Sequence, residues 1–83
     1  MEWLYAKGIP IEAQYLYRKG LDLSRQGNDE GALRYFRQAV ILAPQYGTAF
    51  FEMGNCLSRL GRHNEAHERY EQASHIGSSP LPR

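Results

Sequence analysis

The chain is short, almost neutral and poor in cysteine, and these properties exclude several classes of protein. Its 83 residues suffice for one small domain, and its charged side chains balance to a net charge of +1. A balance so near zero provides no basic field for nucleic acid and no polybasic patch for a membrane, so neither partner is expected.

Three further features of the sequence favour a cytoplasmic protein. No apolar run approaches the roughly 18 residues that cross a bilayer. The N-terminus has an acidic second residue, Glu2, and no long apolar core, so it does not resemble a signal peptide. The single cysteine, Cys56, cannot form an internal disulfide, which fits a reducing compartment.

Residues 1–12 form an apolar N-terminal segment, in which a short helical stretch would end at Gly8 and could not continue through Pro10. Two roles are open to this segment. It covers the first long helix of its own chain, or it joins copies of the chain into a homo-oligomer. The apolar residues concerned are Trp3, Leu4, Tyr5, Ile9 and Ile11.

After this segment, apolar residues recur at spacings of three and four, which predicts helices rather than strands. The first helix should run from about residue 11 to 26 and end at Gly27. The second should run from about 29 to 42, with Asn28 or Asp29 accepting hydrogen bonds at its start. The expected inward residues are Tyr15, Leu16, Lys19, Gly20 and Leu23 in the first helix, and Ala32, Leu33, Phe36, Ala39, Val40 and Leu42 in the second.

A second pair of helices follows the same plan. The third should run from about residue 46 to 60 and end at Gly61, and the fourth from His63 or Asn64 to about 76. Short connections make consecutive helices antiparallel neighbours. Residues 78–83 are expected to form a flexible tail. The expected inward residues of the third helix are Ala49, Phe50, Met53, Gly54 and Leu57.

The two helix pairs are copies of one another. A shift of 34 residues places Gly20 on Gly54 and brings a series of other identical residues together. A fixed period in the range of about 20–50 residues is typical of a helical repeat array. The other identical pairs are Leu23 and Leu57, Ser24 and Ser58, Arg25 and Arg59, Gly27 and Gly61, Ala32 and Ala66, Gln38 and Gln72, and Ala39 and Ala73.

This pattern resembles that of the tetratricopeptide repeat (TPR) family. The resemblance implies an all-α fold of antiparallel helical hairpins stacked as a short solenoid, with one repeat at 13–46 and another at 47–77. The chain departs from the family at Asp29 and His63, where an aromatic residue is common, and at Ser78, where proline is usual. The matching residues are Leu16, Gly20, Leu23, Ala32, Phe36, Ala39 and Pro44 in the first repeat, and Phe50, Gly54, Leu57, Ala66, Tyr70 and Ala73 in the second.

The two copies differ on one face of their second helices. His67 stands where the first repeat has Leu33, and Ser74 stands where it has Val40. The two apolar residues are expected to face the next unit of the array. The fourth helix, which has lost them, is therefore predicted to be a polar terminal cap.

No residue pattern indicates catalysis, a cofactor or a functional metal site. The segment from His63 to His67 lacks the glutamate that zinc proteases carry directly after the first histidine, because Asn64 holds that place. His63, His67 and Glu71 share one helix face, which permits adventitious zinc or nickel binding, but a solvated helix is the simpler interpretation. Cys56 has no activating histidine or helix N-terminus nearby, so a buried inert thiol is expected.

The resemblance implies a binding surface, because the first helix of each TPR repeat lines a concave groove that binds a peptide segment of another protein. Such a groove would suit a peptide with an apolar anchor and an acidic neighbour. Alternatively, these are ordinary exposed residues of a short array. The groove residues would be Gln14, Tyr17, Leu21, Ser24 and Arg25 in the first repeat, and Thr48, Phe51, Asn55, Ser58 and Arg59 in the second.

Within this set, Tyr17 and Phe51 are expected to supply most of the affinity, and Arg25, Arg59 and Asn55 to orient the partner, since aromatic residues and arginine are favoured hot-spot types. The predicted function is a non-catalytic module for protein–protein interaction that needs no cofactor. The alternative is a structural unit that self-associates through its apolar N-terminal segment.

Overall fold

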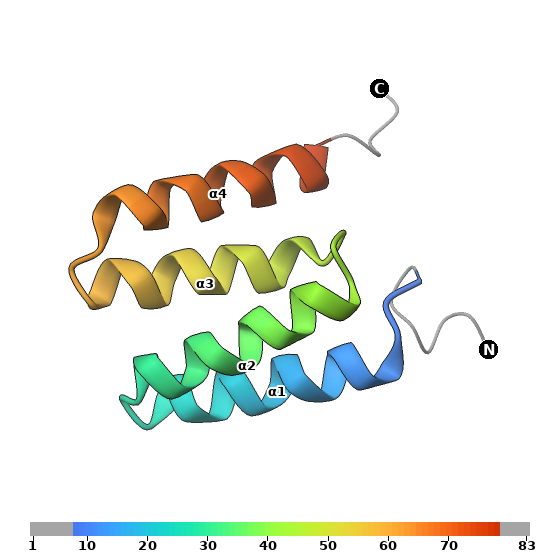
Figure 1. The fold of residues 1–83 in the computed structure, drawn as a ribbon, viewed down its shortest axis with the longest axis horizontal. Helices are drawn as coiled ribbons and strands as arrows, with labels where there is room; N and C mark the ends of the chain where they lie inside the picture. Colours follow the sequence, from blue (N-terminus) through green and yellow to red (C-terminus); the bar gives the residue numbers. More distant parts are fainter. Residues whose placement is uncertain (1–7, 79–83) are drawn as a thin grey trace.

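The computed structural model describes residues 8–78, and this part of the chain is all α-helical. Figure 1 shows its helices stacked in chain order, each antiparallel to the one before. The expected all-α fold is confirmed, and the expected bounds of each helix are met to within two residues. The helices are α1 (Ile11–Arg25), α2 (Asp29–Leu42), α3 (Gly47–Arg59) and α4 (His63–Ser78).

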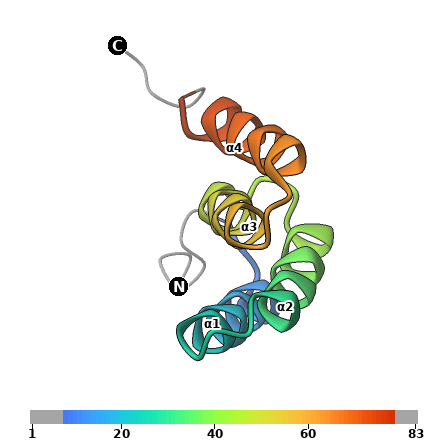
Figure 2. The same cartoon turned by 90° about the vertical axis from the view of Figure 1, so that its left-hand side faces the viewer.

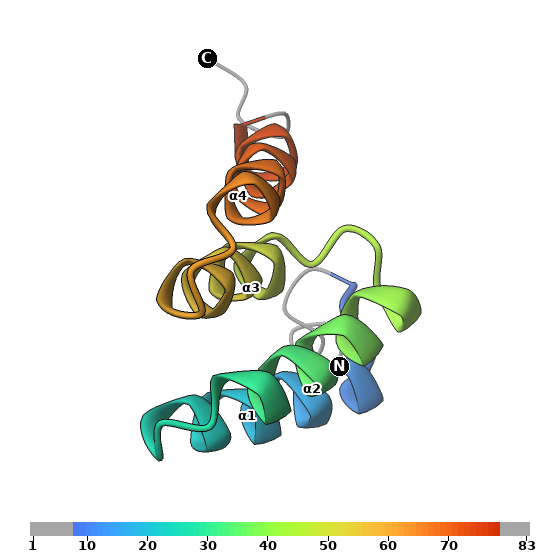
Figure 3. The same cartoon turned by 60° about the vertical axis from the view of Figure 1, so that its left-hand side comes forward.

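The helices form two hairpins, α1–α2 and α3–α4, which pack on each other mainly through α2 and α3. Figure 3 shows the two hairpins one above the other. In Figure 2, which looks nearly along the helices, the chain zigzags so that α1 and α3 lie on one side and α2 and α4 on the other. This is the stacking that the 34-residue period predicts.

Both hairpin turns are built by the same hydrogen bonds around a glycine. Gly27 and Gly61 have φ angles of 85° and 83°, a left-handed conformation that glycine adopts without a Cβ clash. In the first turn, the N–H of Asn28 donates to the carbonyl of Leu23 at 2.9 Å. In the second, the N–H of Arg62 donates to the carbonyl of Leu57 at 2.8 Å. This motif satisfies carbonyls that the helix end leaves free, and it confirms the two glycines as helix stops.

The start of α2 is capped by one of the two residues that the sequence offered. The side-chain oxygen of Asn28 accepts a hydrogen bond from the N–H of Gly31 at 2.9 Å. This contact satisfies one of the free N–H groups at the helix start. Asp29 is therefore the first residue of α2, and its carboxylate is available for another partner.

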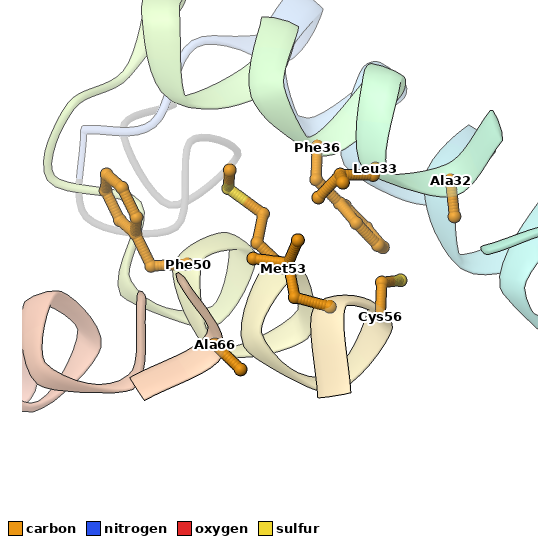
Figure 4. Packing of buried hydrophobic residues seen from close by; sticks show 8 residues of the cluster. Ala32, Leu33, Phe36, Phe50, Met53, Cys56 and Ala66 are labelled. Atoms are coloured by element: carbon orange, nitrogen blue, oxygen red, sulfur yellow. The ribbon is translucent and has the colours of Figure 1, made fainter. Parts of the chain in front are cut away.

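The largest buried cluster lies between α2 and α3 and binds the two hairpins together. Figure 4 shows Leu33 and Phe36 projecting from α2 toward Met53 and Cys56 of α3. Phe36 is 0% exposed and is the largest fully buried side chain among the described residues. A second cluster joins the start of α1 to the α2–α3 connection, and its buried members are Ile9, Ala13, Ala39, Ala43, Tyr46 and Ala49.

Three of the expected inward residues face solvent instead. Tyr15 is 59% exposed and Leu42 is 49% exposed, and Lys19 is also exposed. The rest of the stripe expected on α1 does face inward: Gly20 is buried, and Leu16 and Leu23 pack against the core clusters. Tyr15 lies one helical turn before Lys19 on the outer face, and the Lys19 ammonium lies 5.9 Å from the centre of its ring. Small residues, Ala13 and Gly20, hold the fully buried positions of α1, because α1 and α2 approach each other closely.

The N-terminal segment is described only from Gly8 onward. Ile9 is 5% exposed and packs in the second cluster, so its side chain covers its own array. Ile11 is 54% exposed. The residues 3–5, which carry the other apolar side chains expected to mediate self-association, lie outside the described part of the chain.

Candidate functional site

Tyr17, the first of the two expected aromatic anchors, packs between the repeats. Its ring centroid lies 5.6 Å from that of Phe36 on α2 and 5.0 Å from that of Tyr46, just before α3. Burial raises the pKa of the Tyr17 hydroxyl, and a hydrogen bond with Thr48 acts in the opposite direction. The ring therefore belongs largely to the internal packing of the domain.

Arg59 is held by an ionic and hydrogen-bonded network that joins the first three helices. Its Nε lies 3.1 Å from each carboxylate oxygen of Asp29 on α2, and a terminal nitrogen donates to the Ser24 hydroxyl of α1 at 2.7 Å. The hydrogen bond from Arg59 lowers the pKa of the Asp29 carboxyl, and the same bond raises the pKa of Arg59. Asp29, which the sequence suggested as a helix cap and marked as a departure from the family pattern, thus helps to hold the two repeats together.

This network predicts unequal roles for the two equivalent arginines. Within residues 8–78, Arg25 pairs only with Asp22 of its own helix, at 3.2 Å, and its side chain is 72% exposed. The substitution Arg59→Gln should lower the unfolding free energy by about 1 kcal/mol, because hydrogen bonds to charged groups contribute about 1.5–3 kcal/mol and partial exposure reduces this. Arg25→Gln, the matched control, should change it by less than about 0.5 kcal/mol. Urea denaturation at pH 7 measures both values, and equal losses would contradict the inter-repeat role.

The same prediction has a pH dependence. Because the pKa of Asp29 is lowered in the folded state, its contribution to stability is complete above the ordinary carboxyl pKa of about 3.9 and is lost as pH falls through the lowered value. The difference in unfolding free energy between wild type and Arg59→Gln should therefore shrink on acidification below about pH 4.

Several other residues expected in the groove are only partly available to a partner. Gln14, Leu21 and Ser58 are half-buried, whereas Arg25 and Thr48 are exposed. Leu21 packs against the main core cluster. The side-chain amide of Gln14 donates a hydrogen bond of 2.9 Å to the main-chain carbonyl of Ile9, which precedes α1.

Phe51, the second expected anchor, differs from Tyr17 in that its ring is 50% exposed. It packs against Tyr70 of α4, with ring centroids 5.6 Å apart and an interplanar angle of 50°. The Tyr70 hydroxyl donates to the side-chain oxygen of Asn55 at 2.6 Å, which holds the Tyr70 ring in place. The amide nitrogen of Asn55 lies 3.4 Å from the Glu52 carboxylate, so Asn55 is engaged within the domain at both ends.

Beside this aromatic pair lies an open cavity of about 840 Å³, lined mainly by α3 and the second half of α4, with Ile9 and the α2–α3 connection at its other side. Its surface is almost entirely apolar. A cavity of this size and character is typical of sites that bind an apolar group, with a few polar atoms at the edge to fix its orientation. We call it the α3–α4 groove; its lining residues are Ile9, Gln45, Tyr46, Gly47, Thr48, Phe51, Tyr70, Ala73, Ser74 and Ile76.

The structure thus brings only two of the expected groove residues, Thr48 and Phe51, into one cavity, and adds a wall from α4 that the sequence interpretation missed. That interpretation assigned the groove to the first helix of each repeat alone. The 34-residue period held a signal for this wall, because Ala73 and Ser74 of α4 occupy the positions that Ala39 and Val40 hold in α2. The expected polar face of α4 is confirmed, because His67 and Ser74 are exposed.

The two candidate reactive groups lie away from this groove. Cys56 is 0% exposed, as expected for a buried thiol, and burial raises its pKa above the usual value. His67 is exposed, and its Nε2 lies 3.3 Å from the carboxylate of Glu71 one turn later. Neither residue contributes to the α3–α4 groove.

Within residues 8–78, no helix has the length and hydropathy needed to cross a membrane. A family model described as tetratricopeptide repeat matches residues 13–76. An uncharacterized protein of Methanocaldococcus jannaschii is 42% identical over 57 residues, which cover 69% of this chain and 66% of that protein's length. Residues 13–76, matched by the family model, span the two stacked hairpins. The chain therefore belongs to the tetratricopeptide repeat family, whose domains are generally protein–protein interaction modules and typically not catalysts.

Proposed function

We propose that this domain binds a segment of a partner protein by taking an apolar side chain into the α3–α4 groove. The observation that carries the proposal is the half-exposed Phe51 ring at the edge of a large apolar cavity. An exposed aromatic ring beside a concave apolar surface gains free energy when a partner covers it. Thr48 and Ser74 at the edge supply polar groups that would fix the orientation of the segment.

The residues expected to line the concave groove contribute unequally to this binding. Phe51 becomes the principal contact, because Tyr17 and Arg59 are already engaged between the repeats. Arg25 stays exposed and can meet an acidic residue of the partner at a distance from the cavity. A long segment would therefore start in the α3–α4 groove and extend along the face that α1 and α3 share.

A selection experiment followed by two matched variants tests this function. Peptides selected from a random display library on the wild-type domain are assayed by fluorescence anisotropy against wild type, Phe51→Ala and Ile41→Ala. Ile41 is 71% exposed on α2 and does not line the groove, so its variant is the control for loss of exposed apolar surface.

Phe51→Ala should weaken the selected peptides at least about tenfold, as expected for a hot-spot aromatic residue, while Ile41→Ala should leave them unchanged. Circular dichroism of both variants checks that the helices persist. Equal binding to wild type and Phe51→Ala would reject the groove as the site.

A further inference from the structure

The α3–α4 groove is a structural copy of the surface on α1 and α2 that α3 occupies. Its aromatic pair, Phe51 and Tyr70, follows Tyr17 and Phe36 at the 34-residue period. The centroid distance is 5.6 Å in both pairs, and the interplanar angles are 50° and 47°. The two surfaces therefore present the same aromatic geometry to whatever packs on them.

The glycines beneath the two pairs show the same correspondence. A Cβ atom at Gly20 would lie 2.6 Å from the Phe36 ring, and a Cβ atom at Gly54 would lie 2.6 Å from the Tyr70 ring. The backbone of the first helix thus approaches the ring of the second equally closely in each hairpin. The two surfaces therefore agree in main-chain geometry as well as in the arrangement of their aromatic rings.

In the first repeat, this surface is covered by the beginning of α3. The Tyr46 ring lies 5.0 Å from that of Tyr17, and Tyr46 and Ala49 pack against Ala13 and Ala39 in one buried cluster. Ala13 and Ala39 are both 0% exposed as a result. An aromatic residue followed three positions later by alanine is therefore the sequence that this surface accepts.

Among residues 8–78, nothing covers the second copy of the surface in the same way. Gly47 and Ala73, which correspond to Ala13 and Ala39, are partly exposed. Phe51 is 50% exposed where Tyr17 is half-buried. The apolar site of the first repeat is thus repeated without the helix that fills it.

We infer that the occupant of the α3–α4 groove is an amphipathic helix of a partner protein, bound in the position that α3 takes on α1 and α2. This inference rests on the proposed function and names the form of its ligand. It continues an established interface, that between the two repeats, by one further helix. The partner helix would place an aromatic ring against Phe51 and a small residue, one turn later, against Ala73.

The two copies differ at the far end of the surface, and this difference limits what the helix can carry. Leu33 is 3% exposed beneath α3, but its counterpart His67 is exposed and polar. The counterpart of Asp29, which binds Arg59 of α3, is His63. The partner helix is therefore apolar only in its first two turns and carries polar side chains beyond them. It needs no counterpart of Arg59, because His63 stands where the first repeat has Asp29.

A peptide taken from the chain itself provides the probe. Residues 45–59 with Cys56→Ser and Leu57→Gln, labelled with a fluorophore, carry the aromatic and alanine residues that fit the first surface and polar residues beyond its first two turns. Binding to the intact chain is measured by anisotropy, with Tyr46→Ala and Glu52→Pro versions of the peptide. Glu52 lies in the interior of α3, so Glu52→Pro disrupts the helix and leaves Tyr46 and Ala49 in place.

The peptide should bind, and both Tyr46→Ala and Glu52→Pro should weaken binding at least about tenfold, as should Phe51→Ala in the domain. Ile41→Ala in the domain should have no effect. Equal binding of the parent and Glu52→Pro peptides would reject a helical occupant and leave the groove function standing. If no version of the peptide bound, while library-selected peptides still required Phe51, the helical occupant would again be rejected and the groove function would stand. If the selected peptides were insensitive to Phe51→Ala, the groove function itself would fall.

Sedimentation separates a partner helix from an occupant supplied by the chain. The wild-type chain should remain monomeric as concentration rises and should leave the groove open to the probe. A dimer that Phe51→Ala dissociates would assign the groove to a second copy. A monomer in which deletion of residues 1–7 or 79–83 increases probe binding at least about tenfold would assign it to that segment. Either result would overturn the partner-helix inference.

Discussion

Replacing Phe36 by alanine should lower the unfolding free energy by about 3–5 kcal/mol, the largest loss expected from any single truncation in this domain. Phe36 is 0% exposed, and its ring contacts α1 at Gly20, packs at a tilted angle against Tyr17 and joins the cluster shared with α3. Its removal leaves a cavity between three helices whose positions are fixed by their turns. A domain of this length has a total stability of roughly 4–12 kcal/mol, so most of it is at risk.

Urea denaturation followed by circular dichroism measures this loss, and Ile41→Ala, on the same helix but 71% exposed, is the control. The control should stay within about 0.5 kcal/mol of wild type. A loss below about 1 kcal/mol for Phe36→Ala would mean that the helices close around the gap, and that the ring is not the centre of the core.

Adding a methyl group at the two equivalent glycines should have unequal effects. Gly20→Ala should destabilise the domain by about 1–3 kcal/mol, since its Cβ would lie 2.6–2.9 Å from ring atoms of Phe36, which is buried on all sides. Gly54→Ala meets Tyr70 at 2.6–3.0 Å, but that ring is only half-buried and borders the open groove. The Tyr70 ring can shift toward the groove at the cost of its hydrogen bond to Asn55, and the gain of about 1 kcal/mol in helix propensity then offsets part of the strain.

The two variants serve as each other's control, because the chemical change and the place in the repeat are the same. Their unfolding free energies, measured in urea, should differ by at least about 1 kcal/mol, with Gly20→Ala the less stable. Equal losses would contradict the view that the second aromatic pair is free to move. Any displacement of Tyr70 in Gly54→Ala should also weaken binding in the α3–α4 groove, which the peptide assay detects.

A helix bound in the α3–α4 groove would explain why the aromatic pairs of the two repeats differ in exposure. The first aromatic pair has become core because Tyr46 lies 5.0 Å from Tyr17. The second pair keeps the same geometry and remains half-exposed. Within residues 8–78, the second repeat thus presents a surface of the kind that the first repeat buries, and a partner helix would cover it.

The sequence by itself determined the helices, their order and their ends. The 34-residue period paired the hairpins, and single glycines at 27 and 61 stopped the helices, because a left-handed residue at that position is a local requirement. Residues of α3 predicted to face inward, such as Phe50 and Met53, are buried. These features depend on neighbours in the chain, which is why the sequence alone sufficed.

Only the tertiary structure decided which large residues of α1 face solvent and which residues remain for a partner. Tyr15 is exposed because the close approach of α1 and α2 selects small residues for the interface. Arg59 is engaged by Asp29, a residue 30 positions away that no local pattern connects to it. The wall of the groove on α4 likewise arises where two helices meet. Contacts of this kind depend on the packing of whole helices, and a sequence fixes that packing only through the sum of many small interactions.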